Sequence, residues 1–196
     1  MMIDRLIEID KALFLYLNNL GVDRWDPFWM FISDRTSMFF LISPIIIFYL
    51  IKIEERKAWL SVLMLIICIS ITDLIHVHLF KNLFMRLRPC WDPEISNLCR
   101  IVVGKGGLYG FVSGHAANTA SIVAFFLITK KNNTNKFFVL MLLLWLVLVS
   151  YSRIYLGKHF PLDVICGIIL GFLIALILSK LYKYCRDKIW NMHMFF

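Results

Sequence analysis

Long runs of apolar residues, separated by short polar connectors, dominate the sequence and leave few architectures open to it. A helix needs about 20 predominantly apolar residues to span the hydrocarbon core of a bilayer. The candidate spans lie at roughly residues 27–51, 58–80, 113–130, 137–152 and 161–182. Their uncharged cores are shorter than a full span, so we expect the polar residues near one end of each span to face the protein interior. The pattern predicts an all-α, polytopic membrane helix bundle with about five transmembrane helices.

The composition agrees with this class of protein. Hydrophobic residues make up 60% of the 196 residues, whereas soluble domains contain about 45–50%. The net charge of +8 fits the cytoplasmic flanks of membrane helices and an attraction to anionic lipid head groups. Because the basic residues are scattered among apolar spans and form no soluble basic face, we expect no nucleic-acid partner.

The first 24 residues differ from the rest of the chain. Residues 3–20 alternate charged residues with Leu, Ile and Phe, and the segment is too charged to span, so it predicts an amphipathic helix on the membrane surface. The opening residues MMIDRLIEIDK lack a basic start and a small-residue cleavage site, so no cleavable signal peptide is expected. We therefore divide the chain into an N-terminal amphipathic segment, residues 1–24, and a single membrane-embedded domain, residues 25–196.

Basic residues alone do not determine how the helices are oriented in the membrane. With five spans, the connectors 52–57 and 130–136 and the tail after Lys180 lie on one side. The N-terminal segment, the loop 81–112 and the connector around 152–160 lie on the other side, with a similar number of Lys and Arg residues. The positive-inside rule therefore decides the orientation only if some residues of the second group have a functional role.

Three polar stretches fall on the same membrane face when the chain has five spans. KNLFMRLRP (81–89) leaves the second span, FVSGHAANTA (111–120) opens the third, and SRIYLGKHFPLD (152–163) joins the fourth to the fifth. Charged residues placed at random would not be expected to fall on the same membrane face in all three stretches. We expect these stretches to form a single site.

Each of these stretches offers groups that bind phosphate. Lys81, Arg88 and Arg153 are cations whose N–H donors match phosphate oxygens, which arginine can bind in a bidentate way. Ser113 occupies the N-cap position of the third span and is followed by Gly114. A helix N-terminus with free N–H groups is an anion site, and glycine allows an anion to approach closely. The stretches together predict a phosphate-binding site.

Two histidines and an aspartate add groups suited to phosphoryl transfer. His115 lies in the first turn of the third span, where it can give a proton to a leaving oxygen. Pro161 suits the first turn of the fifth span, which places His159 just before that helix and Asp163 within its first turn. A carboxylate four residues on can accept the imidazole N–H and leave the other ring nitrogen as a nucleophile. The same connector contains Lys158, to which no role is assigned.

Taken singly, these residues also have ordinary explanations. A lone Lys or Arg at a helix end usually extends its charge to the membrane interface. A Ser-Gly-His sequence is often only a helix start, and a lone histidine near a membrane surface is more often structural than catalytic. Ionisable residues at a membrane boundary are costly and usually functional. Three cations, two histidines and an aspartate on one face therefore favour a site over six unrelated features.

These residues resemble the motifs of the type 2 phosphatidic acid phosphatase family. Lys81 with Arg88 and Pro89 matches K-x6-R-P, and Ser113-Gly114-His115 matches P-S-G-H. The connector that begins at Ser152 matches S-R-x5-H-x3-D. The motifs occur in the family's order, and the resemblance covers roughly residues 27–182. One departure is Val112 where the family pattern has Pro, from which we expect altered loop stiffness and little change in chemistry.

The resemblance implies a metal-independent phosphatase that works through a phosphohistidine and needs no cofactor. His159 would be the nucleophile, Asp163 its orienting partner, and His115 the group that protonates the leaving oxygen. The residues implied to hold the phosphate are Lys81, Arg88, Ser113, Gly114 and Arg153. In the bacterial members of the family the site faces the periplasm, which would place this chain in the inner (cytoplasmic) membrane as a multi-pass protein.

The position of the site at the membrane boundary predicts a lipid phosphate or lipid pyrophosphate as substrate. The chain is similar to small bacterial members of the family that act on undecaprenyl pyrophosphate or on the phosphates of lipid A, and phosphatidylglycerol phosphate is not separated from these. Two other functions stay open. One is a lipid phosphotransferase that uses the same site, and the other is a non-enzymatic lipid transporter.

The loop between the second and third spans contains further polar residues, and each of them has two possible roles. Arg86, Arg100 and Lys105 could hold a second phosphate or a sugar phosphate, or could simply be solvated. Cys90 and Cys99 could form a disulfide in an oxidising compartment, or stay as free thiols.

His76 and His78, in the sequence HVH, could suggest a metal site. They lie two residues apart in a helical run and so point to different faces. We expect packing or interface roles for them and no bound metal.

Overall fold

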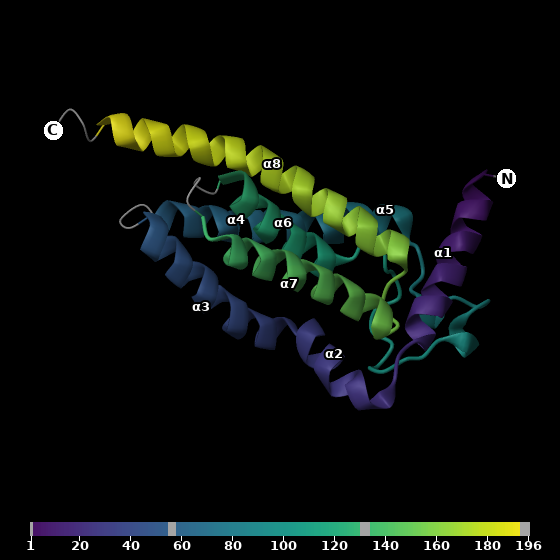
Figure 1. The fold of residues 1–196 in the computed structure, drawn as a ribbon. Coiled ribbons are helices and arrows are strands. Elements are labelled where there is room, and N and C mark those ends of the chain that lie inside the picture. Colours follow the sequence, from purple (N-terminus) through teal and green to yellow (C-terminus); the bar gives the residue numbers. More distant parts are fainter. Residues whose placement is uncertain (1, 55–57, 130–133, 193–196) are drawn as a thin grey trace.

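The computed structural model describes residues 2–54, 58–129 and 134–192, and it confirms the predicted all-α membrane helix bundle. Four helical stretches in this part of the chain are long and apolar enough to cross a membrane: Arg35–Glu54, Ala58–Phe84, Lys136–Tyr155 and Pro161–Ile189. They run side by side along the bundle, with α1 (Met2–Asn19) set across one end of it (Figure 1).

The third predicted span is the short helix α6 (Gly114–Thr129), which lies inside the bundle. Its 16 residues measure about 24 Å, less than the hydrocarbon core of a bilayer. It packs along α8 (Pro161–Met192) at close range, because small residues face each other. A Cβ atom added to Gly167 would lie 2.6 Å from the Ser113 carbonyl oxygen. The start of α6 is thereby fixed against the start of α8.

The first predicted span is not one helix, and the prediction of a continuous span over 27–51 is wrong. The chain forms α2 (Asp26–Ser33) and α3 (Arg35–Glu54), separated by Asp34 in an extended conformation (φ −76°, ψ 120°). The Asp34 carboxylate accepts hydrogen bonds from the backbone N–H and the hydroxyl of Ser37, each at 2.7 Å. Asp34 therefore acts as the N-cap of α3, and this cap starts a new helix inside the apolar run.

The second span extends beyond its predicted end at residue 80. It continues from α4 (Ala58–Ile75) through a π-helical segment, η3 (His76–Lys81), into the short α5 (Asn82–Phe84). The following loop includes the short helices η4 (Pro89–Trp91) and η5 (Ser96–Leu98), and it lies at the same end of the bundle as α1 (Figure 1).

The N-terminal helix was predicted correctly, and one face of it is attached to the bundle. Asp10, Phe14 and Asn18 are its buried residues. The Asn18 side chain donates hydrogen bonds to the carbonyl oxygens of Arg100, Ile154 and Tyr155 at 2.9–3.0 Å. These bonds join α1 to the loop and to the end of α7 (Lys136–Tyr155), and a short helix, η1 (Asp23–Trp25), leads from α1 into α2.

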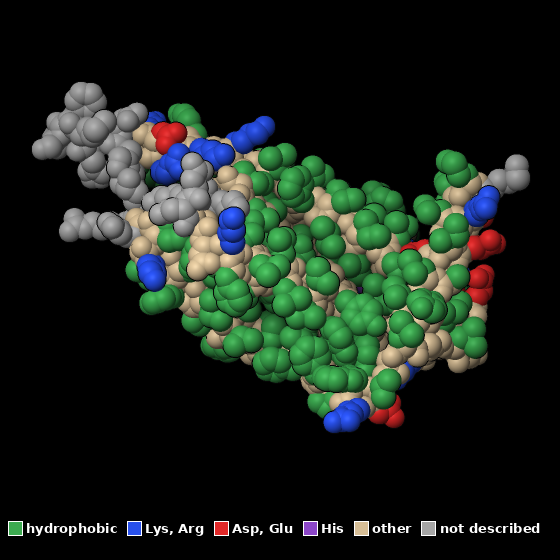
Figure 2. Space-filling model, in the orientation of Figure 1, with side chains coloured by type: hydrophobic (Ala, Val, Ile, Leu, Met, Phe, Trp, Pro, Cys, Tyr) green, Lys and Arg blue, Asp and Glu red, His purple; other side chains and the backbone are tan. Residues whose placement is uncertain are grey.

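The surface of the bundle has the pattern of a membrane protein. Hydrophobic side chains cover most of the visible face, while Lys and Arg side chains gather near the C-terminal end of α8 and acidic side chains lie along α1 (Figure 2). Charge is therefore concentrated at the two ends of this face, where the head groups of a bilayer would lie.

The cysteines of the described residues are free thiols. Cys90 is fully buried and its thiol faces the Lys105 carbonyl, whereas the Cys99 thiol lies 3.1 Å from the Ile95 carbonyl. Burial raises the pKa of Cys99 to about 11. Cys90 and Cys99 are therefore free thiols in the structure and do not form a disulfide with each other.

Candidate active site

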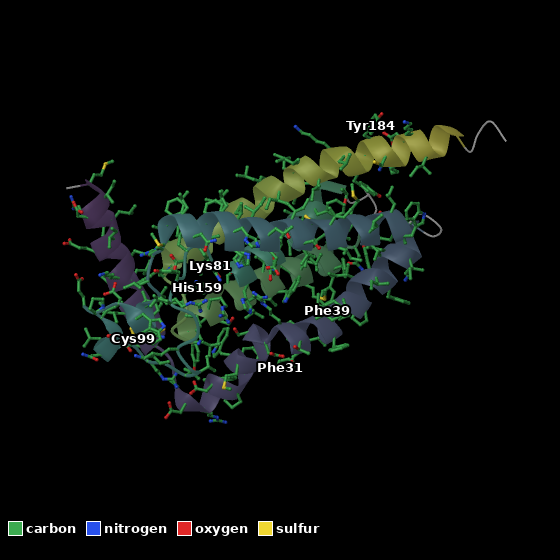
Figure 3. All side chains as sticks on the ribbon, turned by 180° about the vertical axis from the view of Figure 1, so that it is seen from behind. Phe31, Phe39, Lys81, Cys99, His159 and Tyr184 are labelled. Atoms are coloured by element: carbon green, nitrogen blue, oxygen red, sulfur yellow. The ribbon has the colours of Figure 1, made fainter. Side chains whose placement is uncertain are left out.

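The three polar stretches meet at one end of the bundle, as the five-span topology predicts. Figure 3 shows Lys81 and His159 near each other between α1 and the helices of the bundle. Ser113, His159 and Asp163 are almost completely buried, with exposed fractions of 0%, 2% and 0%. Arg153 is also buried. The site is therefore a cluster of polar groups that is shielded within the protein.

The end of α7 is shaped to present His159. Gly157 adopts φ 73°, in the left-handed region that favours glycine, and it ends the helix. The backbone N–H groups of Lys158 and His159 then both donate to the Arg153 carbonyl, at 3.0 and 3.2 Å. Pro161 starts α8 directly afterwards. One turn of backbone therefore connects Arg153, the arginine predicted to bind phosphate, to His159, the predicted nucleophile.

Asp163 does not form the hydrogen bond to His159 that the sequence predicts. Its Oδ2 lies 3.7 Å from Nδ1 of His159, and that nitrogen has no hydrogen-bond partner in the described residues. Asp163 Oδ2 instead accepts the Phe160 N–H at 3.0 Å, which caps α8, and Oδ1 accepts from Arg86 at 2.7 Å. The carboxylate faces the imidazole but is held by the helix start and by a guanidinium.

Arg86 links this carboxylate to α1, a role that neither of its two interpretations, a second phosphate site or a solvated loop, included. Its Nη2 lies 2.6 Å from Asp10 Oδ2, and its guanidinium stacks 4.2 Å above the centre of the Phe160 ring. Asp10 Oδ1 also accepts the N–H of Leu162 at 2.8 Å. Sequence reasoning missed Asp10, because it is 76 residues from Arg86 along the chain and its surroundings indicate only an amphipathic helix.

The other two loop cations are also occupied by contacts within the protein. Arg100 forms ion pairs with Asp23 at 2.7 Å and with Asp26 at 2.6 Å. Lys105 lies 4.6 Å above the centre of the Trp91 ring, a cation–π distance. The structure therefore supports neither a second phosphate site at Arg100 nor a freely solvated loop.

The break between α2 and α3 positions a carbonyl for His115. The Nε2 atom of His115 lies 3.1 Å from the Ser33 carbonyl oxygen. A carbonyl only accepts, so this nitrogen carries a proton. The Ser33 carbonyl is available because Ser37 donates its N–H to the Asp34 side chain instead. The Ser33 hydroxyl also accepts from Arg153 Nη1. Sequence reasoning missed Ser33, and the capping pattern at Asp34 was the only local signal.

Four cations surround His159 without a compensating carboxylate of their own. Lys81, Arg88, Arg153 and Lys158 form no ion pair within the described part of the chain. Arg88 Nε donates to the Tyr109 carbonyl at 3.2 Å, and Lys158 donates to the Gly104 carbonyl. Lys158 was not among the predicted site residues, although it adjoins His159 in the sequence. Such a cluster is costly unless an anion enters it.

The surroundings also affect the ionisation of the groups in the loops. Burial, assisted by the neighbouring Arg153 and Arg88, lowers the pKa of His159 well below its ordinary value. Burial and the same two arginines lower the pKa of Lys158. His159 is therefore neutral near pH 7, and a neutral imidazole has the free nitrogen lone pair that a nucleophile requires.

Several buried polar atoms in the site have no hydrogen-bond partner among the described residues. They include the hydroxyl oxygen of Ser113, Nε of Arg153 and Nδ1 of His159. Buried polar groups are normally satisfied. A hydroxyl and a guanidinium N–H left free beside four cations indicate a site for an anion that is rich in oxygen.

Gly114 is required for packing as well as for the helix start. A Cβ atom at this position would lie 2.8 Å from Cε1 of the His76 ring. His76 is only 2% exposed, so it fills the space beside the first turn of α6, in keeping with the packing role expected for it. His78 is exposed on the other side of the π-helical segment.

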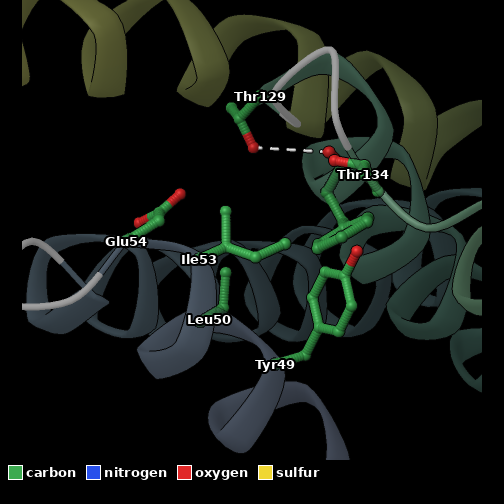
Figure 4. A pocket seen from close by; sticks show the side chains of 7 residues that line it. Tyr49, Leu50, Ile53, Glu54, Thr129 and Thr134 are labelled. Carbon is green, nitrogen blue, oxygen red and sulfur yellow. Dashed lines mark hydrogen bonds between the residues drawn. The ribbon is translucent and has the colours of Figure 1, made fainter.

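A large cavity opens from His115 toward the apolar part of the bundle. Its volume is about 550 Å³, and it lies between α3, α4, α6 and α7. Ser33, Arg35, Asp73 and His115 line its polar end, while Ile, Leu, Met and Phe side chains line most of the rest. A pocket near the other end of α3, lined by Tyr49 and six neighbours, has only about 10 Å³ (Figure 4), enough for roughly one water.

Known proteins share both the sequence and this architecture. The sequence pattern of the PAP2 superfamily matches residues 57–187. The lipid A 4'-phosphatase of Porphyromonas gingivalis is 32% identical over 184 residues, which are 93% of this chain and 77% of that protein. The crystal structure of Aquifex aeolicus LpxE superimposes with a TM-score of 0.65 and 25% identity, over 86% of this chain and 93% of that chain.

A second solved structure has the same fold. The transmembrane PAP2-type phosphatidylglycerolphosphate phosphatase of Bacillus subtilis has a TM-score of 0.71 at 24% identity, over 92% of this chain and 87% of that chain. This chain belongs to the PAP2 superfamily, which confirms the resemblance drawn from the three motifs. Its apolar helices and its relatives make it a bacterial integral membrane protein.

Proposed function

We propose that this protein is a membrane lipid phosphatase that removes a phosphate through a phosphohistidine at His159. The observation that carries this proposal is the cluster of Lys81, Arg88, Arg153 and Lys158 beside a neutral, buried imidazole, with Arg153 and Lys158 themselves buried and Lys81 and Arg88 partly buried. A dianionic phosphate would neutralise the cluster and would satisfy the free donors of Ser113 and Arg153. The membership of the chain in the PAP2 superfamily supports the same chemistry.

The roles of the residues follow from their positions. Because Nδ1 of His159 faces Asp163, Nε2 is the nitrogen that attacks phosphorus. A P–N bond forms as the P–O bond to the lipid breaks, and His115 gives a proton to the leaving oxygen. Water then gives a proton to His115 as it attacks the phosphohistidine, the P–N bond breaks, and inorganic phosphate leaves. Lys81, Arg88, Arg153 and the α6 start at Ser113 and Gly114 stabilise the charge on the phosphoryl oxygens.

The cavity supports a lipid as the substrate. Its polar end lies at His115 and its apolar walls follow α3 and α4, so a head group at the site can leave its tails in the apolar region. The named activity of the Porphyromonas gingivalis relative supports a lipid A phosphate as the substrate. Undecaprenyl pyrophosphate and phosphatidylglycerol phosphate are the other substrates to compare.

The location proposed for the protein is the bacterial inner membrane, with the site facing the periplasm. At the end of the bundle near the site, the basic residues have other roles. Arg86 and Arg100 pair with carboxylates, and the cations around His159 are buried (Arg153, Lys158) or partly buried (Lys81, Arg88). The Lys and Arg side chains near the C-terminal end of α8 lie at the other end of the bundle (Figure 2), where Arg186 pairs only with its exposed neighbour Asp187. The positive-inside rule then places that end in the cytoplasm.

Phosphate release by the detergent-purified protein in EDTA tests this function. We expect turnover of at least one substrate among lipid A, undecaprenyl pyrophosphate, phosphatidylglycerol phosphate and phosphatidic acid, at the same rate with and without EDTA. Free inorganic phosphate as the product supports a hydrolase, whereas a newly phosphorylated acceptor lipid would indicate a phosphotransferase. Binding of these lipids without any turnover would indicate a transporter and contradict the proposal.

Anions that mimic phosphate should stabilise the protein. Orthovanadate or phosphate relieves the repulsion among the clustered cations, and at 100 times its Kd a ligand stabilises the folded state by about 2.7 kcal/mol. We expect a vanadate-dependent rise in the thermal midpoint, measured by tryptophan fluorescence, that is lost in Arg153→Gln. The control is Arg186→Gln near the other end of the bundle, which should keep the rise. An equal rise in both variants would contradict anion binding at this cluster.

A further inference from the structure

A carboxylate lies in the cavity beside the reaction centre and has no role in the steps above. Asp73, on α4, lines the cavity together with His115 and Asn118, and its side chain is 42% exposed. A negative charge near a phosphate site weakens the binding of phosphate by like-charge repulsion. Asp73 therefore needs an explanation other than phosphate binding.

The contacts of Asp73 leave acceptor atoms free. Asn118 donates its Nδ2–H to Oδ1 of Asp73 at 2.8 Å. His76 Nδ1 lies 3.4 Å from the same oxygen but forms no hydrogen bond. The second carboxylate oxygen, Oδ2, has no partner in the described part of the chain, and Oδ1 of Asn118 is buried without a partner. Asp73 and Asn118 therefore each present an oxygen atom that can accept a further hydrogen bond.

These acceptors lie close to the reacting phosphate. Asn118 follows His115 by three residues on α6, so the two side chains share one face of the helix, with about 5–6 Å between their Cβ atoms. A group attached to the phosphate through its leaving oxygen would extend from His115 into this part of the cavity. The acceptors are therefore placed to contact the head group of the lipid.

We propose that Asp73 and Asn118 form a subsite for hydrogen-bond donors on the head group, namely hydroxyl or amide N–H groups next to the phosphate. This inference rests on the phosphatase function proposed above. A phosphorylated sugar on a lipid carries such donors, whereas a polyprenyl diphosphate has none and brings additional negative charge toward Asp73. The subsite predicts that the enzyme prefers a glycolipid phosphate to a polyprenyl diphosphate.

The cavity also contains a cation that offers a competing explanation. Arg35, at the start of α3, lines the same polar end and forms no ion pair within the described residues. If Arg35 and Asp73 paired with each other, Asp73 would serve the protein structure alone. Its replacement would then affect all substrates equally, which makes the two explanations distinguishable.

The test compares two substrates in two variants and a matched control. Asp73→Asn keeps the shape and retains the bond from Asn118, but it replaces the free acceptor with a donor. We expect kcat/KM for a glucosamine-based glycolipid phosphate to fall about 10- to 100-fold, the usual effect of losing a hydrogen bond to a charged group. The kcat/KM for farnesyl diphosphate should stay within about twofold or rise. Asn118→Ala should reproduce the selective loss.

The control is Asp34→Asn, which removes a carboxylate from the same cavity. Asp34 is engaged with Ser37, and asparagine is an equally good N-cap, so we expect no change in substrate preference. An equal fall for both substrates in Asp73→Asn, or no fall for the glycolipid in either variant, would overturn the subsite. Failure of the unmodified protein to release phosphate from either substrate would instead overturn the phosphatase function on which it rests.

Discussion

Replacing His159 with alanine should reduce phosphate release by at least about 10⁴-fold, because the phosphoryl group then has no nucleophile to accept it. His159 is 2% exposed and is surrounded by cations, so a water molecule cannot easily take over the position of the ring nitrogen. The measurement is the rate of inorganic phosphate release from the best lipid of the panel, with protein that elutes as a single species in detergent.

The control for this variant is another histidine of the same chain. His78 lies on the π-helical segment and its side chain is exposed, so His78→Ala should keep the activity within about twofold. A rapid acid-free quench with labelled substrate should also trap a base-stable, acid-labile phosphoprotein in the unmodified protein and none in His159→Ala. Activity retained in His159→Ala would contradict the phosphohistidine mechanism.

Replacing Arg86 with methionine should have the second largest effect, acting on both stability and rate. Arg86 bridges Asp10 and Asp163, whose side chains are 6% and 0% exposed. Its loss leaves two buried carboxylates without a counter-charge, and breaking such a pair costs about 3–5 kcal/mol. We expect a lower thermal midpoint and, in the protein that still folds, a fall in kcat of about 100-fold with little change in KM. The kcat falls because Asp163 can no longer be held toward His159.

A second substitution should restore part of the stability that Arg86→Met loses. Adding Asp10→Asn to Arg86→Met removes one of the two uncompensated carboxylates, so the double variant should recover part of the lost stability. Arg100→Met is the matched control, because its partners Asp23 and Asp26 are 98% and 21% exposed, against 6% and 0% for the partners of Arg86, so water can compensate for more of the loss. If Arg86→Met behaved like Arg100→Met, the bridge would have no role in positioning Asp163.

The helices and motifs were predictable because their signals are local. Apolar runs locate α4, α6 and α7 to within a few residues, and the spacing from Ser152 to Asp163 predicts that an imidazole and a carboxylate lie together. The end of α8 was placed too early, since charged residues after Lys180 continue the helix to Met192. A helix that leaves the membrane can continue in water, and composition does not indicate where it stops.

The partners of the site residues were not predictable, because they are distant in the sequence. His115 and Arg153 meet Ser33 across 82 and 120 residues, and Arg86 meets Asp10 across 76. Nothing near Asp10 distinguishes it from the other acidic residues of an amphipathic helix. The two interpretations of Arg86 both missed its carboxylate partners, because an arginine beside a phosphate motif has the same local pattern whether it binds substrate or a carboxylate.

The bridge through Arg86 also determines how much of the chain makes up the reaction centre. The segment that carries the superfamily pattern, residues 57–187, contains every motif residue, yet Asp10 and Ser33 lie outside it. A protein shortened to that segment would keep the proposed nucleophile and the proposed phosphate-binding residues. It would lack the carboxylate that holds Arg86 and the carbonyl that orients His115. In this protein the segment that matches the superfamily pattern is therefore shorter than the part of the chain that forms the proposed active site.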